Sequence, residues 1–170
     1  MSLKKITSSR HRGSTLIEVL VSLLILSMGL LSMGGLQTVS LKNNQSAYYR
    51  TQATMFANDI ADRMRANMAA VTAGNYNNVA GANTASCFTA AGCTPGQMAA
   101  QDILDWETQV AAALPGGDSV VCLDSSQEDG TPASVACSGT GSVYAIKIWW
   151  DDNRDGTAEQ RYVLSFQPES

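Results

Sequence analysis

The sequence predicts an α+β fold, in which a long N-terminal helix packs on a small antiparallel sheet. Three observations carry this prediction. Residues 19–36 form an uncharged, apolar run, and residues 43–67 form an amphipathic stretch without Pro or Gly. Two β-rich segments, 142–150 and 159–166, lie on either side of a polar turn. Helical patterns followed by strands are typical of helices packed on one face of an antiparallel sheet.

The apolar run 19–36 is long enough to cross a membrane. As a helix it would span roughly 27 Å, close to the thickness of a bilayer core. A secretory signal has a shorter apolar region and a small-residue cleavage site. Ser32–Gly35 loosely resembles such a site, so a Sec-processed secreted or anchored binding domain remains an alternative. Four bases precede the run and place the N-terminus in the cytoplasm by the positive-inside rule: Lys4, Lys5, Arg10 and Arg12.

The residues after Gly13 argue against nucleic-acid binding and against catalysis. Seven bases stand against fifteen acids there, a net of about −8, which disfavours nucleic acid as a partner. The only histidine, His11, lies among the leading bases, so no Ser or Cys in the exported part has an imidazole base. We therefore expect no enzymatic activity and no cofactor.

Four cysteines, an even number, indicate two disulfides in an exported domain. Three pairings are possible, and the loop-local pairing of Cys87 with Cys93 and of Cys122 with Cys137 is preferred. A zinc site is disfavoured because the sequence contains no CxxC pair.

The amphipathic stretch and a second helix supply the predicted core. In the first, an apolar stripe recurs every fourth residue, at Tyr48, Gln52, Phe56, Ile60 and Met64, and Met55 widens it. The second helix begins at Thr94-Pro95-Gly96-Gln97 and ends at Pro115-Gly116-Gly117. Its apolar face comprises Ile103, Trp106, Val110 and Leu114. Residues 72–94 are predicted as loop, and residues 119–123 as a further short strand.

The turn between the two β-rich segments matches the opening of a calcium loop. Asp151, Asn153 and Asp155 take the first three ligand positions, followed by Gly156. The twelfth position is Tyr162, where an EF-hand needs a bidentate Glu. The same residue types are common in ordinary turns, so a plain turn is favoured and calcium is the weaker alternative.

Glu18 is the unusual residue of the apolar region. A charged side chain in hydrocarbon costs about 2.5–3.5 kcal/mol on insertion scales, and such residues usually have a partner. Glu18 either reaches the cytoplasmic interface or pairs with a positive group. If the chain were cut after Gly13, the new α-amine of Ser14 would lie one turn away, and the amine of a neighbouring copy could also reach the carboxylate.

Taken together, the basic leader, Gly13, Glu18 and the run "STLIEVLVSLLILSMGLL" resemble the class III signal of type IV pilins and type II secretion pseudopilins. The resemblance implies a pilin-like fold with a leader (1–13), a transmembrane and assembly helix (14–37) and a periplasmic head (38–170). A prepilin peptidase would cut after Gly13 and methylate Ser14, and Glu18 would form a charge pair with an adjacent subunit. Ser14 departs from the family, which usually has Phe or Met there. Cleavage depends mainly on the glycine, so it is still expected.

Later segments are similar to PilV-type minor pilins, the type IV pilus modification proteins. These are "ANDIADRMRAN", "ILDWETQVAAALPGG" and "YAIKIWWDDN". The resemblance implies a minor subunit that primes assembly near the pilus tip. It also implies other minor and major pilins, the inner-membrane assembly machinery and membrane lipid as partners. The subunit would sit in the inner membrane and then in the pilus at the cell surface. A type II secretion minor pseudopilin and a DNA-uptake pseudopilin are the alternatives.

Overall fold

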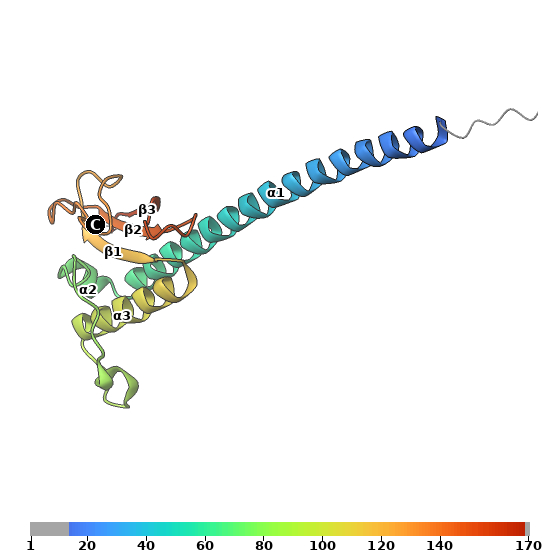
Figure 1. Ribbon diagram of the computed structural model, residues 1–170. Helices are drawn as coiled ribbons and strands as arrows, with labels where there is room; N and C mark the ends of the chain where they lie inside the picture. Colours follow the sequence, from blue (N-terminus) through green and yellow to red (C-terminus); the bar gives the residue numbers. More distant parts are fainter. Residues whose placement is uncertain (1–13, 169–170) are drawn as a thin grey trace, which may run out of the picture. The chain divides into compact units, whose positions relative to one another are not determined.

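The computed structural model describes residues 14–168 and confirms the predicted α+β fold. Its elements, in chain order, are helix α1 (Ser14–Ala66), the short helix α2 (Met68–Thr72), the 3₁₀ helix η1 (Ala85–Phe88), helix α3 (Pro95–Ala113), and strands β1 (Asp118–Leu123), β2 (Tyr144–Trp150) and β3 (Gln160–Phe166). Figure 1 shows them along the chain. Two units, residues 1–45 and 46–170, are distinguished by their internal contacts and are described separately.

The first unit contributes the N-terminal part of α1. All side chains described from residue 15 to residue 45 are exposed. The helix is long and apolar enough to cross a membrane, as the run 19–36 predicts. Its hydroxyl side chains bond to the helix's own carbonyls: Ser22 donates to Glu18 O at 2.7 Å, Ser27 to Leu24 O at 2.8 Å, and Thr38 to Gly34 O at 3.0 Å. These polar groups are therefore satisfied without any neighbour.

The second unit is built on a three-stranded antiparallel sheet in the order β1-β2-β3. The register pairs Val121 with Ile146 and Ile146 with Leu164. All three strands lie where the sequence predicts them, to within two residues at each end. The central strand β2 is buried along its whole length, so both faces of the sheet are covered.

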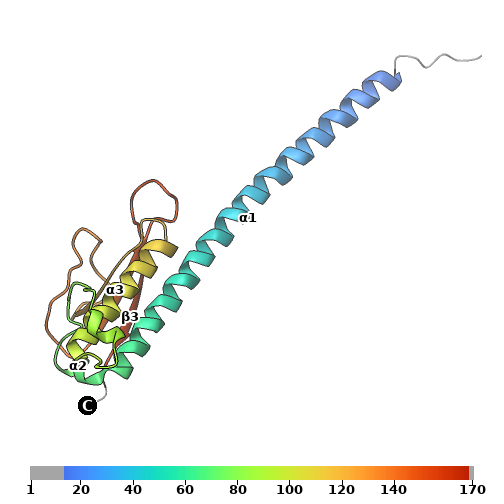
Figure 2. The ribbon, with the colours of Figure 1, turned by 90° about the horizontal axis from the view of Figure 1, so that it is seen from below.

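The C-terminal part of α1 and helix α3 cover one face of this sheet. Trp106, a predicted core residue, is fully buried and donates its indole N–H to Phe56 O at 2.9 Å, which ties α3 to α1. Arg63 on α1 also forms an ion pair with Asp102 on α3, at 3.5 Å. Figure 2, seen from below, shows the two helices side by side. The predicted apolar face of α3 is buried at Ile103, Trp106, Val110 and Leu114.

The predicted apolar stripe of α1 is wrong at its N-terminal end. Tyr48 and Met55 are 57% and 60% exposed, whereas Tyr49, Ala53 and Ala57 are buried. A strict four-residue step advances about 40° around a helix of 3.6 residues per turn, so positions 48 and 64 point about 160° apart. The buried side instead follows mixed steps of three and four residues and uses alanines, which allow the packed elements to approach closely.

Helix α3 begins as its sequence predicts. Thr94 is the N-cap, and its hydroxyl accepts a bond from Gln97 N at 3.3 Å. The Gln97 side chain in turn accepts a bond from Thr94 N at 2.9 Å, completing a capping box with Pro95 at the first helical position. The preceding segment 72–94 is mostly loop, as predicted, but α2 ends within it at Thr72 and it contains η1, which its composition does not indicate.

Candidate functional site

The predicted cleavage and assembly positions lie at the N-terminal end of α1. Gly13 is outside the described residues, and Ser14 is the first residue of the helix. Glu18 lies on the exposed helix surface one turn further along, and its carboxylate has no hydrogen bond or ion pair to any residue between 14 and 168. Glu18 is thus positioned where a partner outside this chain can reach it.

Both cysteine pairs preferred from the sequence are joined in the structure. The Cys87–Cys93 disulfide closes a small loop in which the 3₁₀ helix η1 ends, and the Cα atoms are 4.7 Å apart. The Cys122–Cys137 disulfide connects β1 to the segment between β1 and β2, with Cα atoms 6.1 Å apart. No free cysteine occurs among the described residues.

The Cys122–Cys137 disulfide fastens the outer loop, residues 124–143, over the face of the sheet opposite to the helices. Beneath this loop Val120, Cys122 and Trp149 form a small apolar cluster. Gly130 in the loop has φ +85°, and a Cβ at that position would come within 2.5 Å of Val135 O. Only glycine therefore fits this turn of the loop.

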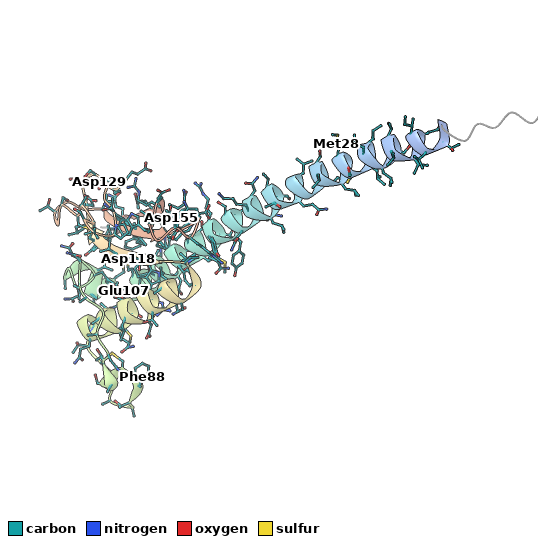
Figure 3. All side chains as sticks on the ribbon, in the orientation of Figure 1. Met28, Phe88, Glu107, Asp118, Asp129 and Asp155 are labelled. Atoms are coloured by element: carbon teal, nitrogen blue, oxygen red, sulfur yellow. A yellow bond between two sulfur atoms is a disulfide. The ribbon has the colours of Figure 1, made fainter. Side chains whose placement is uncertain are left out.

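Lys147 is the residue around which the outer loop is organised. Its side chain projects from β2 and is fully buried. The ammonium lies 2.6 Å from Asp124 Oδ2 and 2.9 Å from Asp129 Oδ1. It also donates to the backbone carbonyls of Val135 at 3.0 Å and Asp129 at 3.2 Å. Figure 3 shows Asp129 on the outer loop. One buried cation thus joins the part of the loop from Asp124 to Val135 to the central strand.

The two carboxylates of this cluster have altered acidity. Burial is the largest influence on Asp124 and opposes its ionisation. The hydrogen bond and charge of Lys147, with the backbone amides of Ser126 and Ser138, outweigh it and lower the pKa of Asp124. The hydrogen bonds from Lys147 and Ser126 lower the pKa of Asp129. The cluster is therefore an ion pair at neutral pH.

Asp151 and Asp155, two residues of the weak calcium candidate, have their carboxylates engaged within the turn. Asp151 accepts backbone N–H bonds from Arg154 at 2.6 Å and from Gly156 at 2.7 Å. Asp155 accepts from Thr157 N at 2.8 Å and from the Asn153 side chain at 2.9 Å. These bonds are typical of a polar turn. Between residues 14 and 168 no group of three or more His, Cys, Asp or Glu side chains is arranged to hold a metal ion.

A polar network that the sequence does not indicate lies where α1, the 72–94 segment and α3 meet. Buried Tyr76 donates its hydroxyl to Asp102 Oδ2 at 2.7 Å, and Asn67 donates to Pro95 O at 2.9 Å. Burial, followed by the hydrogen bond to Asp102, raises the pKa of Tyr76 well above its ordinary value. This network fixes the start of the 72–94 segment, and nothing in it forms a reactive pair.

Two family descriptions match the chain. One, "Type IV pilin Tt1218", covers residues 35–104. The other, "Prokaryotic N-terminal methylation motif", covers residues 8–34. The two matches adjoin and together cover the whole of α1 and the segment up to the middle of α3. No curated protein and no solved structure matches the chain.

Proposed function

Because this chain is a type IV pilin that carries the N-terminal methylation motif, we propose that it is a minor pilin which primes or modifies type IV pilus assembly. The observation that carries the proposal is the single helix α1, whose apolar N-terminal part has Glu18 at its start and falls within the methylation-motif match. In this proposal residues 1–13 are the leader, 14–37 the transmembrane and assembly helix, and 38–170 the periplasmic head.

We also propose that α1 anchors the chain in the inner membrane and that the head is exported to the periplasm. The four leading bases favour a cytoplasmic N-terminus, and α1 is apolar enough to span the bilayer. The Cys87–Cys93 and Cys122–Cys137 disulfides suit the oxidising periplasm. After cleavage the subunit keeps its helix and enters the filament, where Glu18 pairs with the N-terminal amine of an adjacent subunit. Its partners are therefore other minor and major pilins, the prepilin peptidase, the inner-membrane assembly machinery and membrane lipid.

A minor, tip-proximal role is supported by the three segments that resemble PilV-type pilins. They correspond to the end of α1, the second part of α3 with its stop signal, and strand β2 with its following turn. All three contribute to one buried core, which includes Ile60, Trp106 and Ile146. We propose a structural rather than a catalytic role for this head.

A type II secretion minor pseudopilin is the second candidate, because it shares the N-terminal motif. The type IV pilin match over residues 35–104 lies beyond that motif and favours the pilus. Deletion of the gene separates the two: loss of surface pili with normal protein secretion supports the minor pilin, and loss of secretion with normal piliation supports the pseudopilin.

The mass of the mature N-terminus tests the proposed processing. Peptide mass spectrometry of the membrane-inserted protein should find Ser14 as the first residue, with or without the mass of one methyl group. A first residue near Leu36 would identify a Sec-processed protein and refute the pilin proposal. A strain lacking the prepilin peptidase is the control, and there the leader should remain attached.

A further inference from the structure

Phe88 is the most exposed large apolar side chain of the second unit. It is 71% exposed, more than Met55 or Tyr48. Figure 3 shows it on a loop that extends from α3 on the side away from the sheet. The three tryptophans and the other two phenylalanines are buried or partly buried. The fold of the head therefore does not depend on the aromatic ring at position 88.

The loop that carries Phe88 is held in one conformation. The Cys87–Cys93 disulfide closes it, and η1 shapes its first half. Cys87 N donates to Thr84 O at 3.0 Å, and Thr89 Oγ1 donates to Ser86 O at 2.9 Å. Such bonds fix the backbone on both sides of Phe88, so the ring is presented by an ordered loop rather than by a free chain.

The base of this loop is attached to helix α3. Thr84 N donates to Gln101 Oε1 at 2.7 Å, and Ala82 N donates to Ala100 O at 3.0 Å. Gly81 lies against the backbone of Leu104, where a Cβ would come within 2.5 Å of its Cα. Gln101 is itself mostly buried and donates to Asp105 at 2.9 Å. The loop that carries Phe88 is thus attached to α3, whose apolar face packs in the core of the head.

The stretch of chain that carries Phe88 contains no charged residue. Residues 66–101 contain no Asp, Glu, Lys, Arg or His, although the rest of the head is acidic. A loop without bases offers no attraction of its own for phosphates, which disfavours nucleic acid and anionic lipid headgroups as its occupant. An apolar side chain in uncharged, small-residue surroundings fits a protein surface that offers an uncharged apolar socket.

We propose that Phe88 is an anchor with which this pilin docks into an uncharged apolar socket on the head of a neighbouring pilin subunit. The proposal rests on the proposed function, which supplies the neighbouring subunit. An aromatic ring on a disulfide-closed loop loses little conformational freedom on binding, which is the property of interface anchors. Transfer of the exposed ring into a socket should strengthen association roughly tenfold to a hundredfold.

The test compares substitutions of Phe88 in the full chain, expressed in a strain that lacks its own copy. Phe88→Ala should lower the amount of this subunit in sheared pili roughly tenfold, whereas Phe88→Leu, which keeps an apolar side chain, should retain most of it. Cellular levels of both variants should equal wild type, because the ring is outside the core. A photo-crosslinking phenylalanine analogue at position 88 should give an adduct with a second pilin, identified by its own methylation motif. The same analogue at exposed Thr140, on the outer loop, is the positional control.

Each outcome decides the proposal. Wild-type incorporation of Phe88→Ala overturns it, as do adducts with lipid or with non-pilin proteins only, or equal pilin adducts from position 140. If the deletion strain has lost its pili and Phe88→Ala restores them fully, the minor-pilin function stands and the docking role falls. If the deletion strain makes normal pili, both fall.

Discussion

At the scale of single residues, Lys147 connects the outer loop of the head to the central strand. Its ammonium is buried with Asp124 at 2.6 Å and holds the outer loop against β2, together with the Cys122–Cys137 disulfide and the Arg161 side chain, which donates to Gly130 O at 3.0 Å. Buried ion pairs contribute little net stability when complete, but breaking one leaves an uncompensated charge in the interior. The outer loop therefore depends on the pair being complete.

Lys147→Met should destabilise the head by about 3 kcal/mol, because Asp124 would remain buried without its partner. Thermal or urea unfolding of the full chain in detergent measures this loss. The double variant Lys147→Met with Asp124→Asn should recover part of the stability, since the orphaned charge is removed as well. Equal stability of the single and double variants would show that Asp124 is not held as a buried charge.

Acid should weaken the same cluster. The pKa values of Asp124 and Asp129 are lowered in the folded state, so their contribution is fully present above the unfolded value of about 3.9. It is lost as pH falls through the lower folded pKa values. The melting temperature should therefore fall steeply below about pH 4. Asp124→Asn should melt lower at neutral pH and show a shallower acid dependence; an unchanged acid slope would contradict this assignment.

Glu18→Ala should be cleaved and inserted like wild type, because neither step needs the carboxylate. It should fail to support normal piliation, since the proposed charge pair with an adjacent subunit is lost. Immunoblots of the processed chain and counts of surface pili separate the two effects. The control is Ser22→Ala, which changes a neighbouring polar side chain on the same helix and should piliate normally. Normal piliation of Glu18→Ala would remove the pairing role.

At the scale of elements, the sequence predicts best where the signal is local. The cap of α3 and the β-rich segments of β2 and β3 are local signals, and these elements are found where they are expected. The inward side of α1 depends on which elements pack against it, and the four-residue stripe failed there. Nothing in the sequence marked Lys147 as a buried residue. Its partners lie 18 and 23 residues away, in a loop whose path no local pattern fixes. The cysteine count indicated disulfides, but nothing local singled out Phe88 as exposed.

The two disulfides should differ in their effect on stability. They close segments of 6 and 15 residues, which corresponds to about 2 and about 3 kcal/mol of chain entropy in the simplest treatment. Replacing Cys122 and Cys137 by Ser should therefore lower the melting temperature of the full chain more than replacing Cys87 and Cys93. The larger effect is also expected because the outer loop covers the sheet. The reverse order would show that the loop carrying Phe88 contributes to the core.

At the scale of the whole molecule, the two units have different proposed roles: the first is the membrane and assembly helix, and the second is the folded head. The described side chains of the first unit, residues 15–45, are all exposed, and those of the run 19–36 are apolar or small, as suits a helix surrounded by lipid or by other helices. The second unit has its own core, built from α1, α3 and one face of the sheet. Its opposite face is closed by the outer loop. Phe88, the proposed docking residue, lies outside this core.

The self-bonded hydroxyls of the first unit have a consequence for filament growth. Ser22, Ser27 and Thr38 have their hydrogens committed to the helix's own carbonyls. The helix can therefore leave a lipid environment and enter a protein one without breaking or gaining a single hydrogen bond through these groups. These three hydroxyl groups then add no polar barrier to extraction from the bilayer, and the remaining cost depends on side-chain packing and on the other polar groups of the helix, Glu18 among them.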